Sequence, residues 1–213
     1  MTKESYILPT GGILVMEDSK IIDGTITTTD VGASLAAMPR YNGAASYSVA
    51  AHSFHMAQYA ERNDIALAYA CLMHDIDEMI TGDINRIFKE SLGKTIASAI
   101  NRKSESIRRE VERAVLRSVG FAAPELDNAE RKRINDALID IDNRIVRNEI
   151  ECLFGEDTWE AIIAIRPELQ RAPLDYDLPA RHDYAFRADP RKPCTPQWRI
   201  KFRQIADEYL LKG

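Results

Sequence analysis

In the stretch CLMHDIDEMITGD, residues 71–83, one histidine and four carboxylates come directly after an apolar run. The residues just before the histidine, IALAYACLM at 65–73, have the composition of a helix that packs in a protein core. A buried carboxylate without a partner is costly. The stretch therefore predicts either a helix that reaches the surface abruptly at His74 or a polar site inside the fold, in which the acids are paired or bind a metal.

Helix signals dominate the chain from Asp30 onward. Serine or aspartate stands where most of the predicted helices begin, and glycine or proline follows the end of most of them. Ser46 and Ser48 both remain open as the start of the second helix. The predicted helices span residues 30–38, 46–62, 64–80, 83–91, 94–119, 127–154 and 196–211.

The two ends of the chain differ from this helical body. Residues 12–16 and 20–22 resemble two short strands around a turn, with residues 25–29 extended behind them. Residues 167–196 hold six of the nine prolines and predict a long loop. The expected fold is all-α: an N-terminal β-hairpin (1–29), a helical domain (30–166), and a proline-rich loop and helix (167–213) that pack on the same domain.

Composition narrows the function classes. The chain has 213 residues, 45% hydrophobic, and a net charge of −5, which gives no hint of nucleic-acid binding. Its three cysteines are scattered without a CxxC spacing, and the longest apolar run, nine residues, is too short to span a membrane. The N-terminus lacks the apolar region of a signal peptide. We therefore expect a protein of a reducing, cytoplasmic compartment, and neither a membrane protein nor a nucleic-acid binder.

The histidine at the end of the apolar run has neighbours suited to metal chemistry. On a continuous helix with about 100° per residue, His74, Asp75 and Glu78 share one face, and Asp77 lies outside it. An imidazole, a carboxylate and a second carboxylate one turn on suit two ligands of a divalent cation and a general base. The other His-Asp pair, residues 182–183, lies in the proline-rich segment and is interpreted as part of a surface loop.

A further histidine lies upstream, in YSVAAHSFHMA. His52 falls in the predicted helix with Val49, Met56 and Ala60 on its apolar side. Its neighbour His55 is interpreted as a core residue or one that packs near the surface.

Together these segments resemble the HD-domain phosphohydrolases, and more narrowly the branch of 5'-deoxynucleotidases and phage deoxynucleoside-triphosphate hydrolases. The resemblance covers about residues 30–155. It rests on RYNG (40–43), YSVAAH (47–52), HDIDE (74–78), TGDI (81–84) through Lys89, and Asp142 with Glu149 seven residues later.

This resemblance implies one divalent metal ion held by His52, His74, Asp75 and a distal aspartate. Asp136, Asp140 and Asp142 are all in range, and Asp140 and Asp142 point about 200° apart on a helix. The spacing to Glu149 favours Asp142, with Asp140 as the alternative. A nitrogen and oxygen ligand set fits Mn²⁺, Co²⁺, Fe²⁺ or Zn²⁺ better than Mg²⁺, which stays an option.

The implied reaction is hydrolysis of a phosphate ester or anhydride at the 5' position of a (deoxy)nucleotide, releasing a nucleoside and phosphate or triphosphate. In it Glu78 would transfer the proton, and Arg40 and Lys89 would neutralise the phosphate. Asp83 would bond a sugar hydroxyl or orient the water, or it would only cap the helix that follows.

One position departs from the family. Tyr41 stands where the deoxynucleotidases carry a tryptophan that helps recognise the sugar, and it would stack on the base or merely pack. Deoxyribose selectivity and the number of phosphates therefore stay open. The alternative is an HD-fold nucleotide-binding or regulatory protein without strong catalysis, and a homodimer or higher homo-oligomer is also open.

Overall fold

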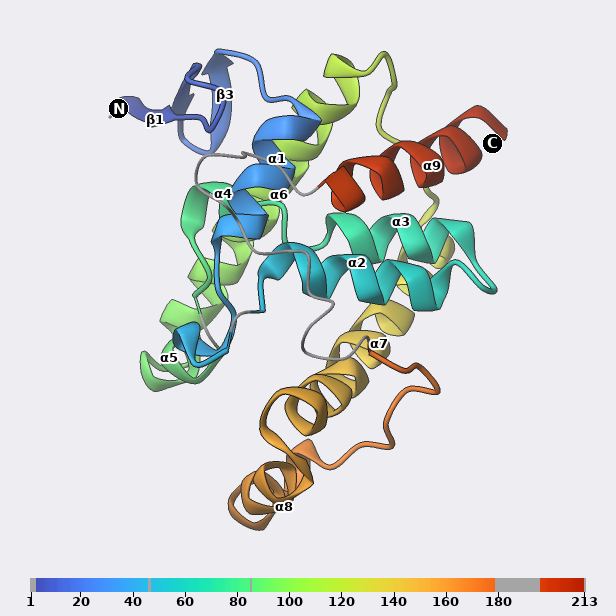
Figure 1. Ribbon diagram of the computed structural model, residues 1–213. Coiled ribbons are helices and arrows are strands. Elements are labelled where there is room, and N and C mark those ends of the chain that lie inside the picture. The colour runs from blue at the N-terminus through green and yellow to red at the C-terminus, as the bar shows by residue number, and fades with distance from the viewer. Residues whose placement is uncertain (1–2, 46, 85, 179–195, 213) are drawn as a thin grey trace.

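The computed structural model describes residues 3–45, 47–84, 86–178 and 196–212 (Figure 1). The chain is mostly helical, with a small antiparallel sheet at its N-terminus. The prediction of a helical body is confirmed, and the predicted hairpin is one strand larger than expected.

The sheet has the order β1-β2-β3, from β1 (Lys3–Ile7), β2 (Ile13–Glu17) and β3 (Lys20–Asp23). Asp18 and Ser19 join β2 to β3 with positive φ angles of 49° and 67°, the backbone that a tight two-residue hairpin turn requires. Leu14 and Met16 of β2 are buried, whereas Ile13 is exposed. The sheet therefore packs one face on the helices.

The first helix, α1 (Thr28–Ala37), begins three residues earlier than its signal predicted. Thr27 is the N-cap, and Asp30, expected to be the cap, is instead the third residue of a capping box with Thr27. The Asp30 carboxylate also accepts hydrogen bonds from the backbone N–H and hydroxyl of Thr10. Asp30 therefore ties the loop between β1 and β2 to the start of α1.

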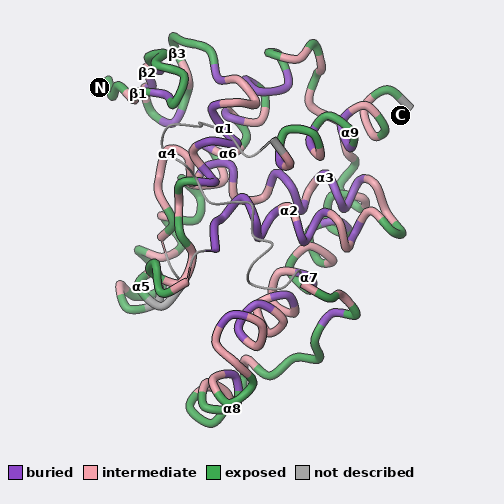
Figure 2. The backbone as a smooth tube through the Cα atoms, viewed as in Figure 1, coloured by how far each residue is buried: buried purple, intermediate pink, exposed green. Residues whose placement is uncertain are grey.

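The core is built around α2 (Val49–Ala60) and α3 (Ile65–Met73), which lie side by side at the centre of the molecule (Figure 1). Both helices are buried along most of their length (Figure 2). Ser48 caps α2, and Trp198 and Phe202 of α9 (Pro196–Lys212) stack and are buried with them. A site on α2 or α3 is therefore held by well-packed helices.

The helix predicted for residues 64–80 is broken, which corrects the expectation of one continuous face. α3 ends at Met73, and α4 (Glu78–Thr81) follows after a turn. The His74 ring N–H donates to the Cys71 carbonyl, which a continuing helix would offer to the N–H of Asp75. The next backbone bonds, such as Glu78 N–H to the Asp75 carbonyl, span only three residues. The histidine side chain itself therefore helps to end the helix.

The remaining helices largely match the predictions. α5 (Arg86–Ser91), α6 (Lys94–Ser118) and α7 (Asn128–Phe154) begin and end within three residues of their predicted limits. A short turn, η1 (Tyr41–Gly43), precedes α2, and another, η2 (Pro167–Leu169), follows α8.

Helix α8 (Glu156–Ile165) was not predicted. It starts directly after Gly155, which ends α7, and Trp159 is its one buried residue within the described chain. Beyond η2, residues 170–178 run along α7, where Asn148 bonds the Leu174 backbone. The rest of the proline-rich segment, with the His-Asp pair at 182–183, lies outside the described residues.

In the described part of the chain, no helix combines the length and the apolar character needed to cross a membrane. Cys71 and Cys152 are free thiols.

Candidate metal centre

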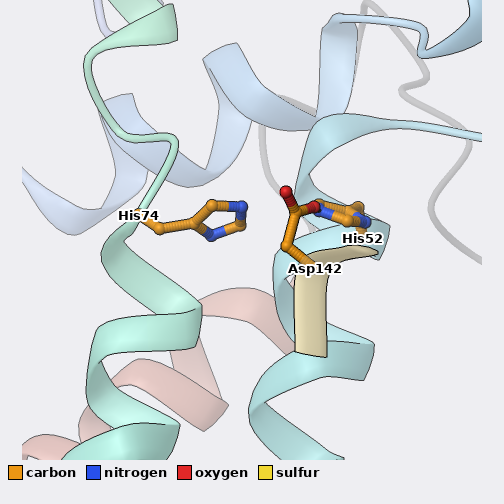
Figure 3. A group of neighbouring side chains, drawn as sticks. All are labelled: His52, His74 and Asp142. Atoms are coloured by element: carbon orange, nitrogen blue, oxygen red, sulfur yellow. The ribbon is translucent and has the colours of Figure 1, made fainter. Parts of the chain in front are cut away.

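Three side chains from separate helical segments converge at one point. His52 comes from α2, His74 from the residue that ends α3, and Asp142 from the middle of α7. One ligand atom from each lies within 4.8 Å of the others. Figure 3 shows the His74 ring and the Asp142 carboxylate facing one another, with the His52 ring beside the carboxylate.

Hydrogen bonding sets the protonation of the His52 ring. Its Nδ1 lies 2.6 Å from Oε1 of Glu149. Burial and the Arg40 charge alone would lower the pKa of His52, yet the carboxylates of Glu149 and Asp142 outweigh them and raise it to about 9. An ionised carboxylate can only accept, so Nδ1 donates to Glu149. With a pKa of about 9, the ring of the metal-free protein also carries a proton on Nε2, which faces Asp142 and which a bound metal ion would displace.

The ring of His74 is arranged in the same way. Its Nδ1 lies 2.8 Å from the Cys71 carbonyl oxygen, which only accepts, so Nδ1 carries the proton. Its Nε2 lies 2.9 Å from Oδ2 of Asp75. Histidines that bind metals typically donate their other ring N–H to a carboxylate or a backbone carbonyl. Both histidines of the cluster follow this pattern.

The donor atoms of the cluster face one another at distances that suit either a shared proton or a bound cation. His52 Nε2 is 3.2 Å from Oδ1 of Asp142. This buried nitrogen has no well-aligned hydrogen bond within the described residues. Metal–ligand bonds of about 2.0–2.2 Å place two donors of one ion roughly 3–4 Å apart. The separation of His52 and Asp142 fits that range, and the whole set needs only a small closure to hold a divalent ion.

The surroundings of Asp142 differ from those of Asp140 and Asp136, the alternatives for the distal ligand. Asp142 lies in the cluster, and the neighbouring histidines hold the pKa of its carboxyl far below the ordinary value although burial opposes them. Asp140 is 57% exposed and forms an ion pair with Arg144. Asp136, which is also exposed, pairs with Lys132. The arrangement therefore brings Asp142, and neither alternative, to the histidines.

Asp75 lies at the edge of the cluster. It contacts His74 Nε2, and its Oδ2 is 3.9 Å from the Arg40 guanidinium. Burial would raise the pKa of Asp75, but the His74 ring beside it lowers the value. Asp75 is close enough to share a cation with His74, although it is not one of the three residues whose ligand atoms are mutually close.

Glu149 supports the centre from behind. Its carboxylate is fully buried and accepts hydrogen bonds from His52, from the hydroxyl of Tyr41 and, at 3.0 Å, from the hydroxyl of Tyr47. Arg40 Nε lies 3.6 Å from its Oε2. Burial alone would raise the pKa of Glu149, but His52 and Arg40 hold it well below the usual range. The charge of Glu149 is therefore present at neutral pH and fixes the orientation of His52.

The Tyr41 side chain is packed among other side chains of the protein. Its hydroxyl donates to Glu149, and its ring packs edge-on against Phe154. Its backbone has a positive φ of 55°, as has Asn42 with 53°. Two successive non-glycine residues in this conformation are strained.

A small cavity of about 180 Å³ adjoins His74. Asp75 and Glu78 line it on one side and Lys89 on another. Burial and the nearby charges of Asp75 and Asp83 raise the pKa of Glu78 to about 9. Asp83 itself is exposed, in the segment between α4 and α5. Of the predicted substrate residues, Lys89 thus lies at the cavity, Arg40 lies against Asp75 and Glu149, and Tyr41 is not in the cavity lining within the described chain.

Helix α6 contributes residues to this cavity that the sequence had not indicated. Asn101, Ser104 and Arg108 line it opposite the acidic turn. Their spacing of three and four residues places them on one helical face, a signal that could have identified them.

Comparison of the chain with protein-family models and with curated proteins finds no match.

Proposed function

We propose that the protein is a metal-dependent phosphohydrolase that acts at the 5' position of (deoxy)nucleotides. The family resemblance of the sequence supplies the reaction class. The observation that carries the proposal is the convergence of His52, His74 and Asp142, with both imidazoles tied at Nδ1 and their Nε2 atoms directed at carboxylates.

A divalent ion held by these three residues, with Asp75 at its edge, would supply Lewis acidity at a phosphoryl oxygen and lower the pKa of water. Arg40, held between Asp75 and Glu149, would offer its remaining N–H groups to a phosphate. Lys89 lines the adjacent cavity and would add a second positive charge. These two cations would offset the negative charge that develops during phosphoryl transfer.

Glu78 is the residue proposed to move the proton. It lines the cavity beside His74 and Asp75, and its raised pKa of about 9 keeps a proton on the metal-free protein at neutral pH. A cation bound beside Glu78 would lower this pKa toward neutral pH. A carboxyl group with a pKa near the working pH can take a proton from water and return it to the leaving oxygen.

The size of the cavity limits what it would hold. At about 180 Å³ it is smaller than the roughly 300–1,000 Å³ of typical ligand pockets, so it would enclose a phosphate and part of a sugar. The base would extend outside it. We therefore expect the enzyme to depend more on the phosphate and sugar than on the identity of the base. A reducing, cytoplasmic location, inferred from cysteine usage, is part of the same proposal.

The test is phosphate release from a panel of nucleoside and deoxynucleoside mono- and triphosphates, after chelation and after return of Mn²⁺, Co²⁺, Zn²⁺ or Mg²⁺. We expect turnover only with metal, and a decrease of about 10²–10⁴-fold in Glu78→Gln with metal content unchanged. Glu61→Gln, which alters an acid that pairs with Lys201, is the matched control and should keep full activity. Metal and nucleotide binding without turnover on any substrate would instead indicate the regulatory alternative.

A further inference from the structure

A second cavity, larger than the one beside His74, lies on another side of α6 from the acidic turn. It has a volume of about 530 Å³ and lies between α3, α6, α7 and α9, where the loop after α6 closes one side. Glu105 and Arg108 line both this cavity and the smaller one beside His74. Their side chains bond to each other at 2.5 Å. We call the larger space the α6–α7 cavity.

The floor of the α6–α7 cavity is apolar and aromatic. Met73 and Ile134 line it and are buried. The rings of Tyr69 and Tyr209, which also line it, lie 5.4 Å apart between centroids and are tilted by 44°. Tyr69 is held in place by a hydrogen bond from its hydroxyl to Glu112. Such a floor suits the flat face of a ring.

The rim of the same cavity is basic. Five basic side chains and two acidic ones line it, so its net charge is three positive, in a chain whose net charge is −5. The five basic residues are Arg108, Arg109, Arg113, Arg131 and Lys132. Arg109 and Arg113 are 51% and 54% exposed and pair with Glu105 and Glu110. Such exposed ion pairs contribute little, so a phosphate could compete for either guanidinium. A basic patch on an acidic protein attracts anions from solution.

Volume, floor and rim together define the ligand. The volume lies within the roughly 300–1,000 Å³ of small-molecule pockets. Tyr69 and Tyr209 would contact a planar ring, and Arg109, Arg113 and Arg131 would reach phosphate groups, for which the guanidinium fork is well suited. We propose that the α6–α7 cavity is a second binding site, separate from the metal centre, for a nucleoside di- or triphosphate.

This site requires neither the metal nor any catalytic activity, because none of the three clustered ligands lines it. It would nevertheless influence the metal side. A ligand that drew Arg108 away from Glu105 would move a shared wall of the two cavities, and Met73, on the floor, directly precedes His74.

The test uses full-length Asp142→Ala protein in EDTA, so that the metal centre cannot bind the probe. Calorimetric titration with ATP should give one saturable site whose affinity falls as salt rises. Arg113→Glu and Arg131→Glu should each weaken binding at least tenfold. Arg117→Glu makes the same charge change at an exposed position of α6 outside the cavity, and should bind as the parent does.

Three results would overturn the proposal. They are no saturable binding of ATP, equal affinity in all three arginine variants, and binding that requires both Asp142 and metal, which would place the probe at the metal centre. Inorganic triphosphate serves as the second probe, and we expect it to bind at least tenfold more weakly than ATP. Equal affinity for the two probes would contradict the role given to the aromatic floor. Circular dichroism of each variant checks that it is folded.

Discussion

At the scale of single residues, Glu149 is the side chain on which the proposed metal centre would depend, although it is not one of the proposed ligands. Four groups converge on one fully buried carboxylate: the His52 ring, two tyrosine hydroxyls and the Arg40 guanidinium. Removing one partner of such a buried charged network typically costs about 3–5 kcal/mol of folding free energy.

Glu149→Gln should therefore damage both metal binding and stability. The amide keeps the shape of the side chain but loses the charge, and its NH₂ group would face donors. We expect metal affinity to fall about 10–100-fold, the usual effect of removing a partner behind a ligand histidine. Calorimetric titration with Mn²⁺ and thermal unfolding measure the two effects. Glu151→Gln, two residues along α7 and paired with Arg147, is the control, and an unchanged Mn²⁺ affinity in Glu149→Gln would exclude this role.

Tyr41 provides a second prediction at this scale. The sequence left open whether Tyr41 stacks on the base or packs within the protein. Its hydroxyl donates to Glu149, and its ring packs on Phe154. Tyr41→Phe should lower the free energy of unfolding by about 1.5–3 kcal/mol, the worth of a hydrogen bond to a charged group. The KM for nucleotide should change less than twofold. A large increase in KM with unchanged stability would restore the role in substrate binding.

At the scale of helices and strands, the break after α3 shows where sequence patterns stop being informative. Apolar periodicity and the Asp64 cap identified the start of α3 correctly. Periodicity could not identify its end, because the His74 ring bonds the Cys71 carbonyl and the chain tightens into a turn. His74, Asp75 and Glu78 still line one cavity. The residues were thus predicted together, although the geometry expected for them was wrong.

The segment at residues 170–178 is fastened to α2 through His55, which gives a prediction on pH. His55 Nδ1 lies 2.9 Å from the Tyr176 hydroxyl, which in turn donates to Gln58. Burial lowers the pKa of His55 to about 4, although the Glu149 charge opposes this and His52 adds to it. Below about pH 6.5 the unfolded chain therefore binds a proton at His55, whereas the folded protein binds it only as the pH approaches 4.

The contribution of His55 to stability is fully present above about pH 6.5 and is lost as pH falls toward 4. We expect a loss of roughly 3 kcal/mol across this window, since each pKa unit corresponds to about 1.4 kcal/mol. Chemical denaturation of the metal-free protein at several pH values measures it, and His55→Gln should remove that part of the slope. Tyr176→Phe should keep the slope, because burial is the main cause. Identical slopes in wild type and His55→Gln would contradict the assignment.

At the scale of the whole molecule, local signals predicted the order of elements better than their contacts. Caps and glycines identified most helices, whereas α8 was missed because only Trp159 in it is buried within the described chain. Spacing in the sequence limited the candidates for the distal metal ligand to three aspartates and favoured Asp142. Which carboxylate faces His52 depends on how α7 crosses α2, and no local pattern records such a crossing. The same holds for Glu149, which had been only a marker of spacing.

We propose that α2, the end of α3 and α7 together form one metal site. The most direct measurement is metal content and Mn²⁺ titration of the wild type against Asp142→Ala and Asp140→Ala, two changes on the same helix. We predict one metal ion per chain for the wild type, loss of tight binding in Asp142→Ala, and wild-type binding in Asp140→Ala, since Asp140 is 57% exposed and pairs with Arg144. Wild-type affinity in Asp142→Ala, or loss of metal in Asp140→Ala alone, would contradict the site described here.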